Sequence, residues 1–341
     1  MILQRNTQVE DQYGHLISYL RISVTDRCNE RCAYCMPSEF QEWLPREKVM
    51  SYEELLRVVE VAAGLGVNKI RITGGEPLTR RDVIPFIKSV ANIPGINEVG
   101  ISTNGTLLSR PIDGFSTAAE ALAEAGVKTV NVSLDTLDEK TYVAITGRPF
   151  LSKAIDGIDA ALNAGFDRVK INSVLMRSRT EDELIKLLDF ACDRNLLLRF
   201  IEMMPVSTKD VLTDCNFLPC GEVISYLSER LGKLQALPDF KTNGPASYYS
   251  VPKRDQVIGF IGAMTNLHFC DSCNKLRLTC DGKLRPCLGS HLEFDLLSEI
   301  RKGVNDATIE NFIRAVVLRK PKAHEFKENY QPDRKMIAIG G

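Results

Sequence analysis

The sequence predicts an α/β fold in which six short strands alternate with amphipathic helices and form a parallel sheet. The first observation is the rhythm of the chain, because β-branched runs alternate with longer amphipathic runs from about residue 19 to residue 202, as in consecutive βα units. The second is position, because cysteine, glycine and polar residues follow the ends of successive predicted strands. Barrel enzymes build their sites at this rim, so a partial barrel is favoured over a doubly wound sheet, which periodicity alone leaves open.

The individual elements follow from local patterns. Two capping boxes, Ser51-x-x-Glu54 and Thr180-x-x-Glu183, predict helix starts. Gly66, Gly126 and Gly165 each stand between a predicted helix and the next strand, where helix C-caps occur. The predicted strands cover residues 19–25, 67–73, 98–103, 127–134, 168–175 and 197–202, and the predicted helices cover 52–64, 81–92, 115–125, 151–164 and 181–194.

The alternation stops near residue 205. Beyond it the chain mixes turn-forming residues with two predicted helices, near 221–231 and 306–319. We therefore predict a barrel domain over residues 1–205 and a smaller domain over residues 206–341. Without a low-complexity linker between them, the second domain is expected to pack against the barrel.

Composition limits the possible functions. The formal charge of −1 over 341 residues argues against a protein that binds nucleic acid without sequence preference, which needs a surplus of Lys and Arg. The sequence has no apolar stretch long enough to span a membrane and no signal-peptide core at its start, so a cytoplasmic location is expected. Disulfides are rare there, and ten cysteines, six of them in two clusters, point to metal binding.

The first cluster is Cys28, Cys32 and Cys35, a C-x3-C-x2-C pattern directly after the first predicted strand. A cubic [4Fe–4S] cluster normally takes four thiolates, so three close thiolates leave one iron open to a small molecule. Zinc with a distant fourth ligand, or simple buried thiols, are the alternatives. The spacing differs from the paired C-x2-C knuckles of structural zinc sites, which favours the iron–sulfur interpretation.

The second cluster is Cys270, Cys273 and Cys287, with Cys280 between the last two. Asp281-Gly282 is typical of a two-residue hairpin turn, which would pair Cys280 with Lys283. Cys287 would then lie four residues further from the turn than Lys283, roughly 13 Å away at ~3.3 Å per residue. We therefore predict a second three-cysteine site in which Cys280 takes no part. A closed four-thiolate site stays open as the alternative, because the register of a short hairpin can slip.

The segment around Cys28, Cys32 and Cys35 resembles the signature of the radical S-adenosylmethionine (SAM) superfamily. Its combination with a second three-cysteine cluster resembles the GTP 3′,8-cyclase family of molybdenum cofactor biosynthesis. The resemblance covers nearly the whole chain and includes segments 19–28, 71–78, 102–105, 132–135 and 244–249 and the terminal Gly-Gly. It implies a partial (β/α)6 barrel of the radical SAM type, with a C-terminal domain that holds a second [4Fe–4S] cluster.

The resemblance also implies roles for individual residues, transferred position by position. The first three cysteines would hold the cluster that binds SAM, and the second three an auxiliary cluster. The departures are Lys275, where the family usually has arginine, and residues 206–220 and 263–266. The implied SAM contacts are Tyr34 (by its backbone), Gly75, Ser133 and Met204; the implied GTP contacts are Arg21, Arg71, Thr103, Lys170, Lys275 and Arg277; Gly340 and Gly341 would reach the active site and aid SAM cleavage.

The implied reaction converts GTP to (8S)-3′,8-cyclo-7,8-dihydroguanosine 5′-triphosphate. A radical derived from SAM would remove the hydrogen atom at C3′, and the ribose carbon would then bond to C8 of guanine. The implied partners are a reducing electron donor and a downstream cyclic pyranopterin monophosphate synthase, with the chain a monomer or homodimer. Two alternatives remain: a radical SAM enzyme acting on a peptide or another small molecule, and a non-enzymatic zinc protein.

Overall fold

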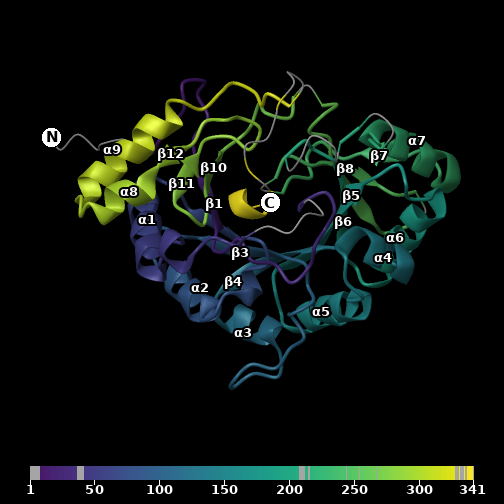
Figure 1. Cartoon of the computed structure of the whole chain (residues 1–341). Coiled ribbons are helices and arrows are strands. Elements are labelled where there is room, and N and C mark those ends of the chain that lie inside the picture. Colours follow the sequence, from purple (N-terminus) through teal and green to yellow (C-terminus); the bar gives the residue numbers. More distant parts are fainter. Residues whose placement is uncertain are drawn as a thin grey trace.

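Six parallel strands follow one another in chain order and curve into an open barrel (Figure 1). The computed structural model describes residues 8–36, 42–206, 212–213, 216–242, 244–252, 254–266, 268–326, 330, 334 and 336–340. Gly341 and Cys215 therefore lie outside the described residues. The strands are β1 (Tyr19–Ser23), β2 (Lys69–Thr73), β3 (Glu98–Thr103), β4 (Val127–Ser133), β5 (Arg168–Leu175) and β6 (Leu197–Glu202).

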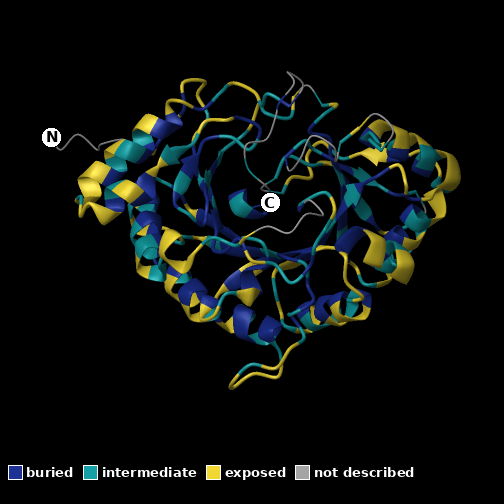
Figure 2. Ribbon diagram, viewed as in Figure 1, coloured by how far each residue is buried: buried dark blue, intermediate teal, exposed yellow. Residues whose placement is uncertain are grey.

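Helices cover the outside of this sheet, with their buried faces toward the strands and their exposed faces toward solvent (Figure 2). Both predicted capping boxes are present, and a third forms between Thr117 and Glu120. Among the described helices of the barrel region, α4 was not predicted. The helices are α1 (Tyr52–Gly64), α2 (Val83–Ala91), α3 (Ala118–Glu124), α4 (Glu139–Thr146), α5 (Leu151–Asn163) and α6 (Glu181–Asp193), with short 3₁₀ turns η1 (Arg46–Lys48) and η2 (Pro77–Thr79).

The second half of the chain extends the same sheet at both edges. One strand, β9, pairs in parallel with β6, and another, β10, pairs in parallel with β1. The division at residue 205 stays a prediction, but the two regions share twelve strands of one sheet within the described residues. The elements are α7 (Cys220–Leu231), β7 (Gln235–Ala236), β8 (Ser247–Ser250), β9 (Val257–Ile261), β10 (Lys275–Leu278), β11 (Lys283–Arg285), β12 (Phe294–Asp295), α8 (Leu296–Arg301), α9 (Asp306–Val317) and α10 (Met336–Ile339).

The predicted register of the β10–β11 hairpin is wrong by one residue. Thr279 rather than Cys280 pairs with Lys283, since Thr279 N–H donates to the Lys283 carbonyl at 2.9 Å. A two-residue turn of the predicted type needs a positive φ at both central residues, and here Gly282 has φ +75° whereas Asp281 is not among the positive-φ residues. A three-residue connection forms instead. Cys280 is fully buried, at 0% exposure.

Strand alternation separates the core from the barrel interior. Ile22, Ile72 and Ile101 lie side by side in the register of β1, β2 and β3, and each is 0% exposed within the hydrophobic core that includes the helices. The preceding residue of each strand points to the opposite face, because side chains alternate along a strand. Arg21 and Arg71 therefore face the interior of the barrel.

Glu202, the last residue of β6, joins the barrel to the second region. Its carboxylate is 0% exposed and accepts hydrogen bonds from the backbone N–H groups of Cys220, at 2.9 Å, and Met264, at 2.8 Å. Thr265 adds its N–H and its hydroxyl, at 3.1 and 2.5 Å. One buried carboxylate thus anchors the start of α7 and the turn after β9.

We expect Glu202→Gln to lower the free energy of unfolding by about 2–4 kcal/mol, because its amide group faces N–H donors that would lose their acceptor. The urea midpoint of the cluster-free chain measures this loss. Glu222→Gln is the control, since its ion pair with Arg177 is exposed and contributes less than about 1 kcal/mol. Equal midpoints for the two variants would contradict the assigned role of Glu202.

Candidate active site

The interior of the barrel contains a cavity of about 1030 Å³. This volume is at the upper end of the range for small-molecule sites. Both cysteine clusters line it, the first from the loop after β1 and the second from the loops that flank β10 and β11. The two clusters therefore face one shared space.

All predicted site residues apart from the terminal glycines line this cavity. The structure thus brings together residues separated by more than 250 positions in the chain. They are Arg21, Cys28, Cys32, Tyr34, Cys35, Arg71, Gly75, Thr103, Ser133, Lys170, Met204, Cys270, Cys273, Lys275, Arg277 and Cys287.

The first cysteine loop is held by the helix that the sequence analysis missed. Arg31 N–H donates to the carbonyl of Thr146 at 2.8 Å, and Ala33 N–H to that of Ile145 at 2.9 Å. Both acceptors belong to the last turn of α4, whose carbonyls have no partner within the helix. The turn between Cys32 and Cys35 is closed by a 2.9 Å backbone hydrogen bond.

Gly74 and Gly75 allow the backbone after β2 to pack against the start of the cysteine loop. Gly75 N–H donates to the Thr25 carbonyl at 2.7 Å, and a Cβ on Gly75 would lie only 2.3 Å from the Arg27 carbonyl oxygen. In the sequence analysis, the family resemblance implied that Gly75 contacts SAM. The structure supplies a second reason for glycine, which is contact between two backbone segments.

Two buried carboxylates fix neighbouring polar groups. The Tyr34 hydroxyl donates to Asp135 at 2.8 Å, which fixes the position of the Tyr34 ring. Thr103 donates its hydroxyl to Glu76 at 2.9 Å, and Asn104 donates its N–H to the same carboxylate at 2.8 Å. Burial raises the pKa of Glu76 to about 7 and also raises the pKa of Asp135.

The two cysteine clusters differ in their electrostatic surroundings. Burial, aided by the charge of Glu76, raises the pKa of Cys28 to about 12, and burial raises the pKa of Cys32 and Cys35 as well. Metal binding at the first cluster must therefore displace thiol protons. Burial also acts to raise the pKa of Cys273, but the charges of Lys320 and Lys275 outweigh it and lower that pKa below its usual value.

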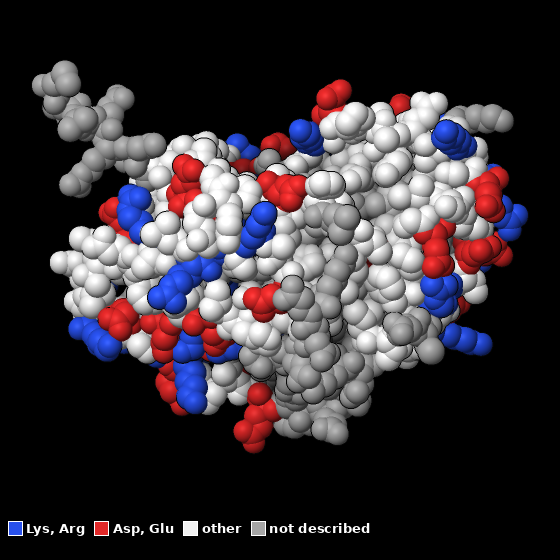
Figure 3. Space-filling model, turned by 90° about the horizontal axis from the view of Figure 1, so that it is seen from above, with Lys and Arg blue, Asp and Glu red and all other residues white. Residues whose placement is uncertain are grey.

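The cavity wall is strongly basic although the whole chain has a formal charge of −1. Among the residues that the structure describes, nine Lys and Arg side chains line the cavity, against three Asp and Glu side chains. On the outer face shown in Figure 3, by contrast, basic and acidic side chains lie among one another on both flanks. This excess of positive charge fits a polyanionic ligand.

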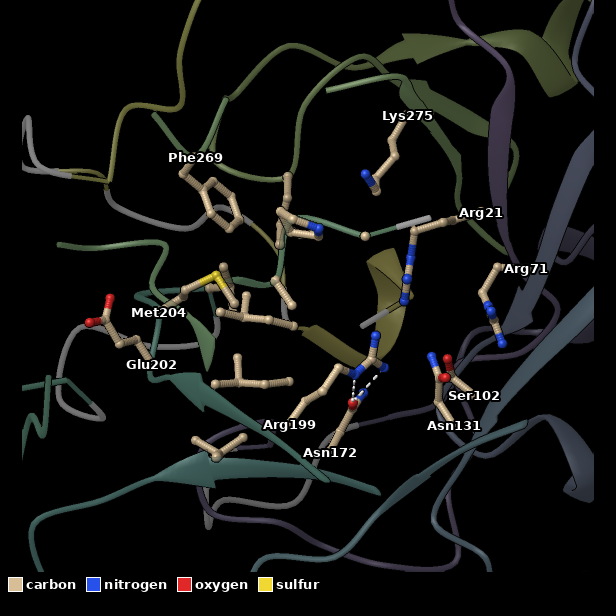
Figure 4. Close-up of a pocket in the computed structure, with 18 of the residues that line it drawn as sticks. Arg21, Arg71, Ser102, Asn131, Asn172, Arg199, Glu202, Met204, Phe269 and Lys275 are labelled. Atoms are coloured by element: carbon tan, nitrogen blue, oxygen red, sulfur yellow. Dashed lines mark hydrogen bonds between the residues drawn. The ribbon is translucent and has the colours of Figure 1, made fainter. Parts of the chain in front are cut away.

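Strand register explains how these cations meet. Arg21 of β1 is directly paired with Arg277 of β10 on one side and with Arg71 of β2 on the other. Like charges opposite one another destabilise a sheet, so an anion that neutralises them would recover stability. Figure 4 shows Arg21, Arg71 and Lys275 extending from their strands toward one space.

Arg71 is held rigidly by the protein itself. Its guanidinium donates to the Tyr19 hydroxyl at 3.1 Å, to the Ile101 carbonyl at 2.9 Å and to the Thr129 hydroxyl at 2.9 Å. It reaches Thr129 across Gly100, where a Cβ would lie 2.4 Å from a guanidinium nitrogen. Gly100 is therefore required for the placement of Arg71.

Buried like charges shift several pKa values in the basic wall. Burial, followed by the charge of Arg199, lowers the pKa of Lys170 to about 6. Burial and the charge of Arg21 lower the pKa of Arg277 to about 9. Burial acts to raise the pKa of Tyr19, but the positive charges of Arg71 and Arg21 outweigh burial and lower this pKa to about 7. Burial and neighbouring cations thus disfavour the charged forms of Lys170 and Arg277.

Sequence reasoning missed several residues of this wall. Arg199 of β6 extends into the cavity and donates two hydrogen bonds to Asn172, at 3.0 and 2.6 Å (Figure 4). Lys69 and Lys320 also line the cavity. Arg199 and Lys69 occupy inward-facing positions of predicted strands. The alternation of side chains along a strand could therefore have indicated that both residues face the cavity.

The C-terminal tail reaches the cavity wall. The short helix α10, yellow in Figure 1, lies within the ring of strands, and its Met336 and Ile337 line the cavity. Arg277 donates to the Gly340 carbonyl at 2.7 Å, and the Ile337 backbone makes a hydrogen bond with Cys35. The tail therefore contacts both the first cysteine cluster and Arg277, a residue predicted to bind GTP.

No three His, Cys, Asp or Glu side chains of the described part of the chain converge closely enough to hold one metal ion. In a cubane each thiolate binds its own iron, so this finding concerns mononuclear sites. Within the described ranges, none of the six clustered cysteines forms a disulfide, and all six are partly exposed. Among the helices that the structure describes, none is both long and apolar enough to cross a membrane.

Comparison with known proteins identifies the family. Residues 22–191 match the Radical SAM superfamily, and residues 196–326 match Molybdenum Cofactor Synthesis C. The GTP 3′,8-cyclase of Pelotomaculum thermopropionicum is 42% identical over 333 residues, which cover 98% of this chain and 100% of that protein. The GTP 3′,8-cyclase of Petrotoga mobilis is 40% identical over 332 residues, covering 97% of this chain and 99% of that protein.

The chain belongs to the GTP 3′,8-cyclase family. This confirms the resemblance found in the sequence, the radical SAM fold class and the assignment as an enzyme. As a member of this family, the chain is a radical SAM enzyme with [4Fe–4S] clusters and SAM as its cofactors. The roles of individual residues stay predictions.

Solved structures agree on the fold. Streptococcus suis SuiB bound to S-adenosylmethionine superposes with a TM-score of 0.59 at 17% identity, covering 94% of this chain and 78% of that one. The structure of anSMEcpe with bound AdoMet gives a TM-score of 0.58 at 17% identity, covering 90% of this chain and 82% of that one. At this identity the likeness concerns the fold alone.

Proposed function

We propose that this chain converts GTP to (8S)-3′,8-cyclo-7,8-dihydroguanosine 5′-triphosphate, the first step of molybdenum cofactor biosynthesis. The observation that supports it is one cavity lined both by the two cysteine clusters and by the basic side chains. The first three cysteines hold the SAM-binding cluster, and Cys270, Cys273 and Cys287 hold the auxiliary cluster. Tyr34, Gly75, Ser133 and Met204 line the SAM pocket.

When bound, the first cluster and SAM supply a 5′-deoxyadenosyl radical that removes a hydrogen atom from the ribose of GTP. The chain's own contribution is position. Arg21, Arg71, Lys170, Lys275 and Arg277 bind the triphosphate, and Thr103 contacts the nucleotide. The charge of the basic wall fixes the phosphates, so that the ribose faces the first cluster and the purine faces the second.

The tail completes the enclosure. Gly340 and Gly341 aid SAM cleavage, and the contacts of Ile337 with Cys35 and of Gly340 with Arg277 support this role. Apolar side chains of α10 exclude water from the reacting atoms, which protects radical chemistry from side reactions. A reducing electron donor, a downstream cyclic pyranopterin monophosphate synthase and a cytoplasmic monomer or homodimer complete the proposal.

Anaerobically reconstituted protein with SAM, dithionite and GTP tests this function. We expect 5′-deoxyadenosine and the cyclised nucleotide to form with GTP and not without it. Iron analysis should give about eight irons per chain, with equal sulfide. Zinc without sulfide, or 5′-deoxyadenosine formation that is indifferent to GTP, would overturn the proposal.

A further inference from the structure

A buried ammonium group lies beside the second cysteine cluster. Lys320 follows α9, is 3% exposed and lines the cavity. Its Nζ donates to the carbonyl of Lys275 at 3.0 Å and to the carbonyl of Pro286 at 2.6 Å. Its own carbonyl accepts from the Gln12 side chain at 3.2 Å, so its backbone is fixed as well.

The two carbonyls belong to the two segments that hold the cluster's cysteines. Lys275 is two residues after Cys273, and Pro286 directly precedes Cys287. A lysine has three N–H donors, and the Lys320 side chain also makes a hydrogen bond with the Cys273 thiol. One ammonium group therefore connects both cysteine segments and a thiol.

A second feature of Lys320 is that it has no carboxylate partner among the residues that the structure describes. Within the described ranges, no Asp or Glu forms an ion pair with it, whereas the buried Lys69 of β2 pairs with Glu98 at 2.6 Å. A buried ammonium without a counterion costs several kcal/mol. Three thiolates around an iron–sulfur core supply the negative charge that is missing here.

We propose that Lys320 is a positioning residue for the auxiliary cluster, which it holds by tying the two cysteine segments together and by serving as the cluster's counterion. This inference rests on the proposed ligands Cys270, Cys273 and Cys287. Net charge and hydrogen bonds to sulfur set the reduction potential of iron–sulfur clusters. A fixed cation stabilises the reduced, more negative state, so Lys320 raises the potential of the auxiliary cluster.

The test isolates the auxiliary cluster in the full-length chain. In a Cys28→Ser/Cys32→Ser/Cys35→Ser parent, about four irons per chain should remain. Two neutral variants, Lys320→Met and Lys320→Gln, are expected to shift the midpoint potential to more negative values in EPR-monitored titrations. They should also lose iron to a chelator several-fold faster than the parent.

Three further variants make the result specific. Lys320→Arg should restore a potential close to that of the parent, because the charge is kept although the guanidinium geometry differs. Lys322→Met is the matched control, since Lys322 is exposed on the same segment, and it should leave potential and iron loss unchanged. Cys273→Ser should remove the remaining iron.

The outcomes separate the inference from the proposed function. If Cys273→Ser keeps its iron, the ligand assignment fails, and the inference fails with it. If Cys273→Ser loses its iron while both neutral variants match the parent in potential and chelation rate, only the role of Lys320 is wrong. Neutral variants that are unfolded even without iron, judged by circular dichroism, would show that Lys320 acts in folding, which also overturns the inference.

Discussion

No 5′-deoxyadenosine above background is expected from a Cys35→Ser variant, and its iron content should fall by about four atoms per chain. Cys35 lines the cavity and is the last of three thiols held on one loop, so the loop offers no neighbouring thiol as a replacement. A serine hydroxyl is not ionised at neutral pH and cannot take the place of a thiolate. Iron analysis and chromatographic detection of 5′-deoxyadenosine measure the two effects.

Cys273→Ser should lose the same number of irons but have a different defect. The first cluster remains, so SAM still binds, whereas stimulation of SAM cleavage by GTP is lost with the second wall of the cavity. Cys192→Ser is the control, because Cys192 is a partly buried thiol of α6 that does not line the cavity. A Cys35→Ser variant with full iron content would contradict the ligand assignment, and so would equal losses in the control.

Lys170→Met is expected to weaken GTP binding by about 10- to 100-fold at pH 7, the range for loss of a charge-assisted contact. Burial and the charge of Arg199 lower the pKa of Lys170 to about 6, so the side chain is mostly neutral at pH 7. A bound triphosphate stabilises the charged form and raises this pKa. GTP binding is therefore coupled to the uptake of on the order of one proton.

The sign of the pH dependence follows from the lowered pKa of Lys170. At pH 7, about one unit above that pKa, protonating Lys170 costs about 1.4 kcal/mol. GTP affinity should thus rise as the pH falls from 8 toward 6, and the gain should end below pH 6, where Lys170 is already charged. Tyr19, with its pKa lowered to about 7, adds proton uptake in the same direction.

Calorimetry in buffers of different ionisation enthalpy measures the proton uptake directly. The difference between the parent and Lys170→Met isolates Lys170 from Tyr19 and from the nucleotide's own titration. Lys128→Met is the matched control, since Lys128 is exposed on the neighbouring strand β4. Identical proton uptake in the parent and in Lys170→Met would exclude Lys170 from the triphosphate site.

Local patterns predicted the barrel strands well because hydrophobic alternation and capping are encoded within a few residues. The bounds of β3, β5, β6 and α1 agree with those predicted. The helix α4 was missed because it spans eight residues and buries few of them. The hairpin register was wrong because the identity of Asp281 and Gly282 does not reveal which of them adopts a positive φ.

The site was predictable where its residues form a motif and not where they stand alone. The spacing of Cys28, Cys32 and Cys35 predicts metal binding. Arg199 is one charged residue within an otherwise ordinary strand. Lys320 lies in the basic run Arg319-Lys320-Pro321-Lys322, which in sequence looks like solvent-exposed surface, because nothing local indicates that one of these lysines is buried.

The sequence by itself determined the order of βα units, the two cysteine clusters and the family of the enzyme. Only the tertiary structure decided that β10 pairs with β1 and β9 with β6, which extends the barrel at both edges. That pairing sets Arg277 beside Arg21, 256 positions earlier in the chain. The physical reason is that register between distant strands depends on the packing of the whole sheet, and it is this register that gathers the cations and both cysteine clusters around one cavity.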